Sequence, residues 1–132
     1  MTEHEHISHD VDHFLRNQID TVPHLEALLL LWNSRPKPWS AEDMAKGLFV
    51  ASETAKEILD DLARQRLIAA EAVSGAFESY RYEPEPDRDQ LIASVDSTYR
   101  RQMIRVSRLI HSKPSAAIRE FARAFRLKKE GE

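Results

Sequence analysis

Hydrophobic positions recur with helical spacing through the first half of the chain. Three segments, beginning near Ser8, Thr21 and Ser52, place them at or close to i, i+3, i+4 and i+7, the period of a buried helical face. The apolar positions are Val11, Phe14, Leu15 and Ile19, then Leu25, Leu28, Leu29 and Trp32, then Ala55, Ile58, Leu59 and Leu62. We expect a helix over each segment, with Ser8 as the N-cap of the first.

A shorter helix is expected between the second and third segments. Ser40 followed by Asp43 is a Ser-x-x-acid start pattern, in which the hydroxyl caps the first turn. Met44, Ala45 and Leu48 supply its apolar side. The preceding NSRPKPW breaks the second helix, and residues 47–50 are expected to form the turn into the third segment.

The middle of the chain changes to strand patterns. Residues 67–73 and 77–82 favour a hairpin joined around Ser74 and Gly75, with Tyr80 and Tyr82 on one face.

Helical spacing returns after the stiff connector EPEPDRD. A single long helix is expected over about 87–111, and a last helix opens at Lys113 and Pro114. Their apolar positions are Leu91, Val95, Tyr99, Met103, Val106 and Ile110, then Ile118, Phe121 and Phe125.

This order of elements resembles a winged helix-turn-helix protein. WSAEDMAKGL is similar to the first helix of the motif, TAKEILDDLARQRLI to its recognition helix and EAVSGAFESYRYEP to its wing. With extra helices at both ends, the chain resembles small bacterial transcriptional regulators of the MarR and PadR types, in which such helices build a homodimer. The tail SKPSAAIREFARAFRLKKE also resembles small uncharacterised bacterial winged-helix proteins, which implies no function.

The resemblance implies a mainly α fold with a small β-hairpin and additional N- and C-terminal helices. We expect one compact unit with an N-terminal helical segment at 1–20, the winged helix-turn-helix at 21–83 and C-terminal dimerisation or partner-contact helices at 87–132. One departure is structural. Such proteins usually carry glycine just before the Leu-Ile that begins the wing, because the helix end favours a left-handed residue, and here Arg66 stands in that place.

The second departure concerns charge. Between Ser52 and Asp61 the expected recognition helix has one basic residue, Lys56, and four acidic residues. The acidic residues are Glu53, Glu57, Asp60 and Asp61. Affinity for DNA comes largely from neutralising phosphates, so these carboxylates oppose DNA binding. A carboxylate can nevertheless accept a hydrogen bond from a cytosine amino group, which leaves a role for Glu53 or Glu57 in a groove.

Basic residues gather behind the motif. The formal net charge is −3, but residues 99–132 carry ten Lys and Arg against three Asp and Glu, while residues 1–98 carry nine against nineteen. Arg101, Arg105 and Arg108 share one helical face, and Arg119, Arg123 and Arg126 repeat that spacing. Each stripe is either a solvated face or a partner for the acidic front half, or else a surface for phosphate or an acidic protein.

Sequence features for metal, cofactor or catalysis are weak. His9 and His13 have the i, i+4 spacing of a metal pair beside Asp10 or Asp12, and His4 and His6 stand nearby, but no second cluster completes a site, so no metal is expected. His24 and His111 are interpreted as packing or capping residues. The chain has no cysteine, no glycine-rich phosphate loop and no nucleophile-elbow motif, so we expect neither a cofactor nor an enzyme.

Two functions remain open. The first is a dimeric DNA-binding transcriptional regulator acting on double-stranded DNA. In this function the bases of the DNA would be contacted by Ser52, Glu53, Thr54, Lys56 and Glu57. The phosphates of the DNA would be bound by Arg35, Lys37, Arg64 and Arg81. The alternative is a winged-helix protein-protein interaction module that does not bind DNA and grips a partner through its acidic helix or basic tail. With no apolar leader or spanning segment, the expected location is the cytoplasm.

Overall fold

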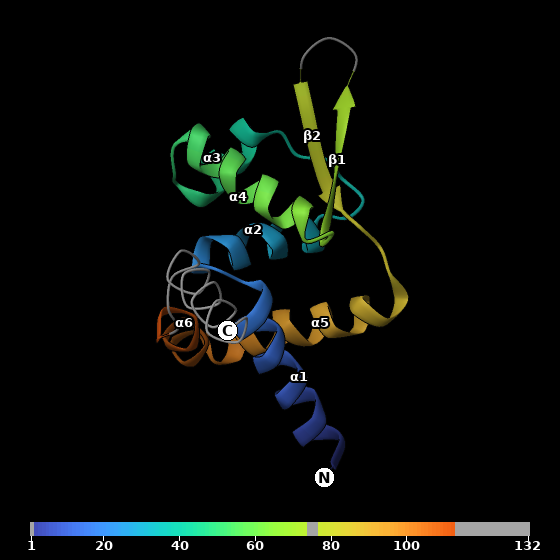
Figure 1. Ribbon diagram of the computed structural model, residues 1–132, viewed down its shortest axis with the longest axis vertical. Helices are drawn as coiled ribbons and strands as arrows, with labels where there is room; N and C mark the ends of the chain where they lie inside the picture. The colour runs from blue at the N-terminus through green and yellow to red at the C-terminus, as the bar shows by residue number, and fades with distance from the viewer. Residues whose placement is uncertain (1, 74–76, 113–132) are drawn as a thin grey trace, which may run out of the picture.

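The computed structural model describes the backbone of residues 2–73 and 77–112, and side chains over 9–71 and 78–112. Within these residues it contains six helices and two strands (Figure 1). Their order is α1 (Thr2–Gln18), α2 (Val22–Asn33), α3 (Ala41–Leu48), α4 (Ser52–Arg64), β1 (Ile68–Val73), β2 (Phe77–Tyr82), α5 (Pro86–Arg101) and α6 (Met103–Ser112). The mainly helical fold with one hairpin confirms the fold class expected from the sequence.

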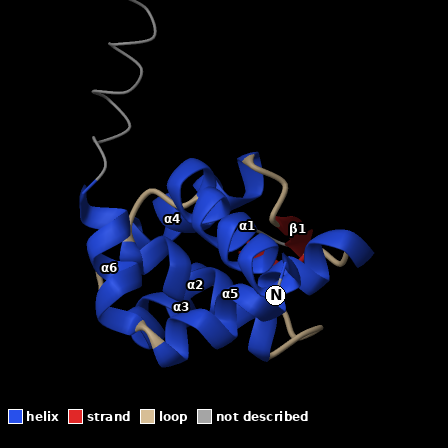
Figure 2. Ribbon diagram, turned by 90° about the horizontal axis from the view of Figure 1, so that it is seen from below, coloured by secondary structure: helices blue, strands red, loops and turns tan. Residues whose placement is uncertain are grey.

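Helix α2 lies at the centre of the fold. In Figure 1 it separates an upper part, made of α3, α4 and the hairpin, from a lower part made of α1, α5 and α6, and Figure 2 shows the helices of the lower part from below. It packs against α3, α4, α5, α6 and β2. Leu25, Ala27, Leu28, Leu29 and Leu31 are all buried, so α2 is apolar around most of its circumference.

The three elements of the helix-turn-helix begin where the sequence predicts. Thr21 caps α2 and Ser40 caps α3, the latter with its hydroxyl accepting a hydrogen bond from the Asp43 amide. The apolar positions expected on α4 are all buried, which fixes its orientation against α2 and α3. The turn is shorter than expected, because Gly47 and Leu48 still belong to α3 and Phe49 ends it in a left-handed conformation.

Two helix boundaries were predicted wrongly. Helix α1 begins at Thr2, so Ser8 lies inside the helix rather than capping it. The single helix expected over 87–111 is two helices, because the backbone breaks at Gln102. The break lets α6 pack against α1 as well as α5, and it leaves Met103 exposed although the apolar pattern placed it in the core.

The hairpin is tied to the segment that precedes α3. Strands β1 and β2 pair antiparallel, with Ile68 opposite Tyr82 and Ala70 opposite Tyr80. Tyr80 also pairs with Trp39, whose amide and carbonyl make hydrogen bonds of 2.7 and 2.8 Å with the Tyr80 backbone. Tyr80 and Tyr82 are both buried, which confirms their common face. Trp32 and Trp39 are partly buried and pack against the core.

Arg66 has the left-handed conformation that the family resemblance implies for its position, with φ of 61°. Its side chain is exposed, so no packing offsets the strain of a Cβ in this region. Arg66→Gly is therefore expected to raise the free energy of unfolding by about 0.5–1 kcal/mol. Ala63→Gly, in the helical backbone of α4, should lower it by about 1 kcal/mol. Urea unfolding of both variants measures this, and a loss of stability in Arg66→Gly would contradict the strain.

Among the described residues, no helix is both long enough and apolar enough to cross a bilayer.

Candidate nucleic-acid interface

The N-terminal half of α4 is open to solvent. Its five candidate base-reading residues, Ser52, Glu53, Thr54, Lys56 and Glu57, are all exposed, while Ala55 and Ile58 between them are buried. This half of α4 stands beside α3 and the hairpin in the upper part of Figure 1. The structure therefore brings together the residues that the sequence grouped as one face.

Two of the four acidic residues of α4 are partly buried and paired with other groups of the protein. Asp61 accepts a hydrogen bond from buried His24, with 2.9 Å between His Nε2 and Oδ2, and its other oxygen contacts Arg64. Asp60 lies 2.8 Å from Lys56 Nζ and 2.8 Å from Tyr80 Oη. Burial alone would raise the pKa of Asp60, but hydrogen bonds from Lys56 and Tyr80 outweigh it and hold that pKa below its usual value. The sequence overstated the charge that α4 presents.

Lys56 is engaged in the same network. Its ammonium group lies 2.8 Å from Asp60 and 3.6 Å from Glu78 of β2, and the bond and charge of Asp60 raise its pKa. The one cation in the N-terminal half of α4 therefore offsets carboxylates of the protein itself. Glu53 and Glu57 are the exposed carboxylates of this half of α4.

Tyr80 links the wing to α4 through its hydroxyl group. Its Oη lies 2.8 Å from Asp60 and 2.7 Å from Glu78, although a phenol has only one proton to donate. Burial, followed by these two carboxylates, raises the pKa of Tyr80 well above its ordinary value. Tyr82 is held similarly by Asp89 of α5, and burial and that hydrogen bond raise the pKa of Tyr82 to about 12.

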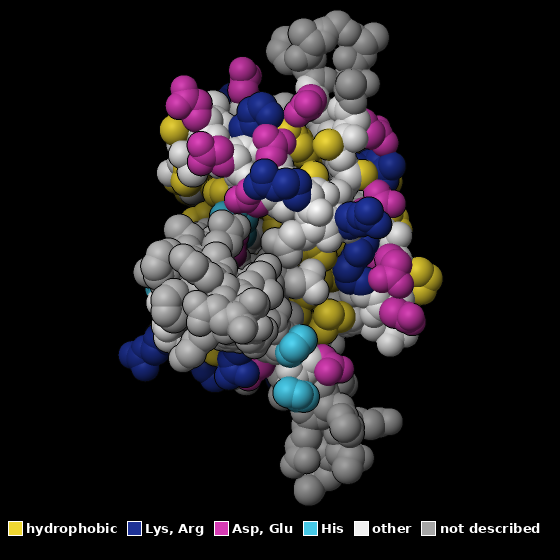
Figure 3. Space-filling view, viewed as in Figure 1, with side chains coloured by type: hydrophobic (Ala, Val, Ile, Leu, Met, Phe, Trp, Pro, Cys, Tyr) yellow, Lys and Arg dark blue, Asp and Glu magenta, His cyan; other side chains and the backbone are white. Residues whose placement is uncertain are grey.

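The four candidate phosphate contacts are exposed or half-buried, and each interacts with a group of the protein. Arg35 stacks on Trp32 with 3.5 Å between its guanidinium carbon and the ring centre, and Lys37 lies 5.1 Å from the ring centre of Trp39. Arg64 pairs with Asp61 and Arg81 with Glu71 on the neighbouring strand. Figure 3 shows the result on one face, where acidic and basic side chains are interspersed over the upper part.

The described arginines of the C-terminal half lie away from α4. Arg101, Arg105 and Arg108 are exposed, but the break at Gln102 places the first on α5 and the others on α6. Arg105 lies 3.2 Å from Asp12 of α1, so one member of the stripe does pair with the acidic front half. The candidates Arg119, Arg123 and Arg126 and the last helix lie outside the described residues.

By sequence, the chain matches no protein-family model and no curated protein. By structure, it is similar to MepR of Staphylococcus aureus bound to DNA, with a TM-score of 0.57, 16% identity and coverage of 100% of this chain and 96% of MepR. It is also similar to the structure of MepR described as a transcription regulator of the Staphylococcus aureus multidrug efflux pump MepA. The TM-score is 0.53 and the identity 18%, with coverage of 96% of this chain and 93% of MepR. A third similar structure is a MarR family protein from Bacillus stearothermophilus, with a TM-score of 0.52, 18% identity and coverage of 98% of this chain and 87% of that protein. The protein has the MarR-type winged helix-turn-helix fold.

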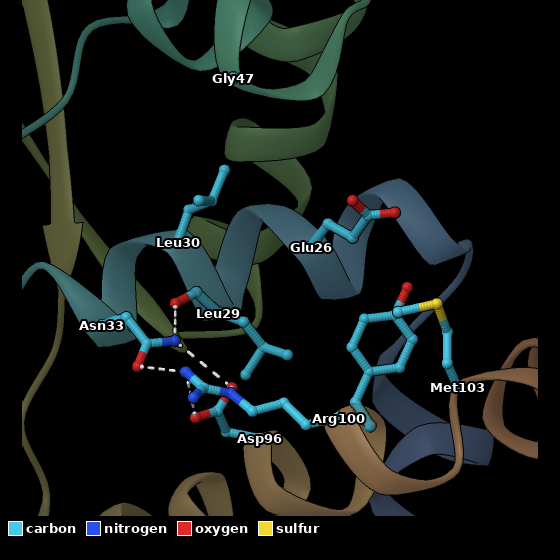
Figure 4. A pocket seen from close by; sticks show the side chains of 9 residues that line it. Glu26, Leu29, Leu30, Asn33, Gly47, Asp96, Arg100 and Met103 are labelled. Carbon is cyan, nitrogen blue, oxygen red and sulfur yellow. Dashed lines mark hydrogen bonds and ion pairs between the residues drawn. The ribbon is translucent and has the colours of Figure 1, made fainter.

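In this MarR-type fold a cavity of about 260 Å³ lies where α2, α3, α5 and α6 meet. Figure 4 shows Asn33 of α2 together with Asp96 and Arg100 of α5 at one side of it, joined by hydrogen bonds and an ion pair. Leu29, Leu30 and Met103 supply apolar walls. Burial, and next the charge of Glu26, raises the pKa of Tyr99, which also lines the cavity. These contacts join the winged part of the fold to the lower helices.

The sequence did not reveal the contacts that hold the acidic residues of α4. His24 was expected to cap or pack, and it does both, since it is buried and bonded to Thr21 and Asp61. The links from Asp60 to Tyr80 and from Asp61 to His24 span 20 and 37 residues. Spacing within one helix carries no signal for such partners.

Proposed function

We propose that this protein is a dimeric transcriptional regulator that binds double-stranded DNA through the N-terminal half of α4. The observation that supports it is the exposed face of α4 within a MarR-type fold, where Asp60 and Asp61 are hydrogen-bonded to Tyr80 and His24. An α-helix presenting short polar side chains such as Ser52 and Thr54 fits a major groove. Its structural neighbours include MepR bound to DNA.

The test is fluorescence anisotropy of labelled mixed-sequence duplex DNA with the full chain, across a series of salt concentrations. Binding that weakens as salt rises indicates release of counterions from phosphates, and the slope reports how many phosphates are neutralised. Arg35→Ala and Lys37→Ala together should reduce that slope, whereas Arg101→Ala and Arg108→Ala, remote from α4, should leave it unchanged. Absence of binding at low salt would contradict the proposal.

A second function is supported by a different observation. With Lys56 tied to Asp60 and Glu78, the first two turns of α4 expose Glu53 and Glu57 and no unengaged cation among their described residues. Such a surface fits a basic protein partner better than a polyanion. If duplex DNA does not bind, this protein-contact function takes precedence, with Glu53 and Glu57 as its centre.

The dimer is proposed to form through α1, α5 and α6, leaving residues 21–83 as the DNA-binding part. Helix α6 exposes two apolar side chains, Met103 at 54% and Ile104 at 70%. An apolar pair on a short surface helix is typical of a face covered in an assembly. Ile104→Glu is expected to convert a dimer into a monomer at micromolar concentration in light scattering. Phe49→Glu, at a side chain that is 93% exposed in the turn before α4, is the matched control and should leave the mass unchanged. A wild-type monomer would contradict the dimer.

A further inference from the structure

Three side chains with metal-binding atoms converge where the α1–α2 junction meets α4. Asp20 follows the end of α1, His24 lies in the first turn of α2 and Asp61 lies in the second half of α4. One ligand atom from each lies within 4.8 Å of those of the other two. Asp20 and His24 are close in sequence, but Asp61 lies 37 residues after His24, so the meeting of all three is a property of the fold.

His24 is held in the orientation of a metal ligand. Its side chain is buried, with an exposed fraction of 7% for the residue. Its Nδ1 lies 2.6 Å from the Thr21 hydroxyl, and its Nε2 faces the Asp61 carboxylate at 2.9 Å. In metal sites a ligating histidine almost always has its second ring nitrogen fixed by a hydrogen bond in this way. Thr21 therefore supplies the outer contact, and Nε2 faces the Asp61 carboxylate.

The surroundings allow an ion to enter and be neutralised. The Asp61 side chain is 29% exposed and Asp20 is half-buried, so solvent reaches one side of the cluster. Arg64 contacts Oδ1 of Asp61 and His24 Nε2 meets Oδ2, so an ion bound by His24 and Asp61 would use Oδ2 in place of that contact. Asp20 and His24 also interact with other groups of the chain, and a bound ion would share or replace those contacts. Two carboxylates balance the charge of a divalent cation.

We propose that Asp20, His24 and Asp61 form a binding site for a divalent transition-metal ion such as Zn²⁺, with a water as the fourth ligand. One imidazole and two carboxylates with an open position are a donor set that Zn²⁺ accepts, whereas Mg²⁺ and Ca²⁺ prefer oxygen ligands alone. The ion takes the place of the hydrogen bond between His24 Nε2 and Asp61 Oδ2. Because Asp61 belongs to α4, the ion joins the exposed helix to the α1–α2 junction.

The experiment uses the full chain with every other histidine replaced by glutamine, at positions 4, 6, 9, 13 and 111. This background is needed because the exposed pair His9 and His13 can itself hold zinc. Zinc is titrated by calorimetry, and thermal unfolding is followed with zinc and with a chelator. One ion per chain and a zinc-dependent rise in the unfolding temperature are expected. Asp20→Asn and His24→Gln should each weaken binding by about tenfold or more.

Asp10→Asn, an exposed residue of α1 outside the cluster, is the matched control and should bind zinc as the background does. If His24→Gln does not fold in chelator, Asp20→Asn decides, because its folded state is checked by circular dichroism before titration. Absence of zinc binding in the background, or equal affinity in Asp20→Asn, would overturn the proposal. No DNA is present in these measurements, so their outcome is separate from that of the DNA-binding test.

Discussion

Replacing Glu53 and Glu57 together by glutamine is expected to raise affinity for mixed-sequence duplex DNA about tenfold or more at low salt. Both side chains are exposed on the half of α4 proposed to enter the groove, and Lys56 is already engaged by Asp60 and Glu78. The double change removes two negative charges where phosphates approach, while glutamine keeps the shape and hydrogen-bonding capacity of each side chain. The gain should shrink as salt rises, because screening weakens the repulsion that the glutamates cause.

The matched control for this variant is Asp10→Asn with Asp87→Asn. It changes the net charge equally, at two exposed positions in the middle of α1 and at the start of α5 rather than on α4. A comparable gain from the control would assign the effect to overall charge and not to the α4 face. An unchanged or lowered affinity in Glu53→Gln with Glu57→Gln would show that this half of α4 does not approach DNA in the proposed way, or that a glutamate accepts hydrogen bonds from bases.

The sequence predicted the elements of the winged part closely, for physical reasons that lie within short segments. The caps at Thr21 and Ser40 are local contacts between neighbouring residues, and the apolar spacing on α4 depends only on the helical period. The missing glycine at Arg66 also pointed correctly to a left-handed residue.

What the sequence could not predict depends on contacts between elements. A continuous apolar line over 87–111 is compatible with one helix, whereas in the structure the backbone breaks at Gln102 and α6 packs on α1 as well as α5. Counting the carboxylates of α4 likewise overstated its surface charge, since Asp61 meets His24 from α2. Formal charge along a helix therefore became informative only when the partners of each side chain were known.

The other large effect concerns stability, at the side chain that joins the wing to α4. Tyr80→Ala is expected to lower the free energy of unfolding by about 3–5 kcal/mol, the range for truncating a large buried ring. The ring is 1% exposed, and its residue pairs with both Trp39 and β1. Tyr80→Phe keeps the ring and loses only the hydroxyl, so it should lower stability by about 1 kcal/mol. Urea unfolding at neutral pH separates the two, and equal losses would show that the hydroxyl rather than the ring holds the wing.

Acid unfolding tests whether the Tyr80 hydroxyl stabilises the fold through its hydrogen bond to Asp60. The pKa of Asp60 lies below its usual value of 3.8 in the folded protein, so this carboxylate contributes stability above about pH 4 that is lost as pH falls through its folded pKa. In Tyr80→Phe one of the hydrogen bonds that lower this pKa is gone, so less stability is lost on acidification. Tyr82→Phe, whose hydroxyl donates to Asp89 of α5 instead, should keep the Asp60 contribution and reduce that of Asp89, because this hydrogen bond lowers the pKa of Asp89. An acid dependence in Tyr80→Phe identical to that of the wild type would contradict the link between wing and α4 through Asp60.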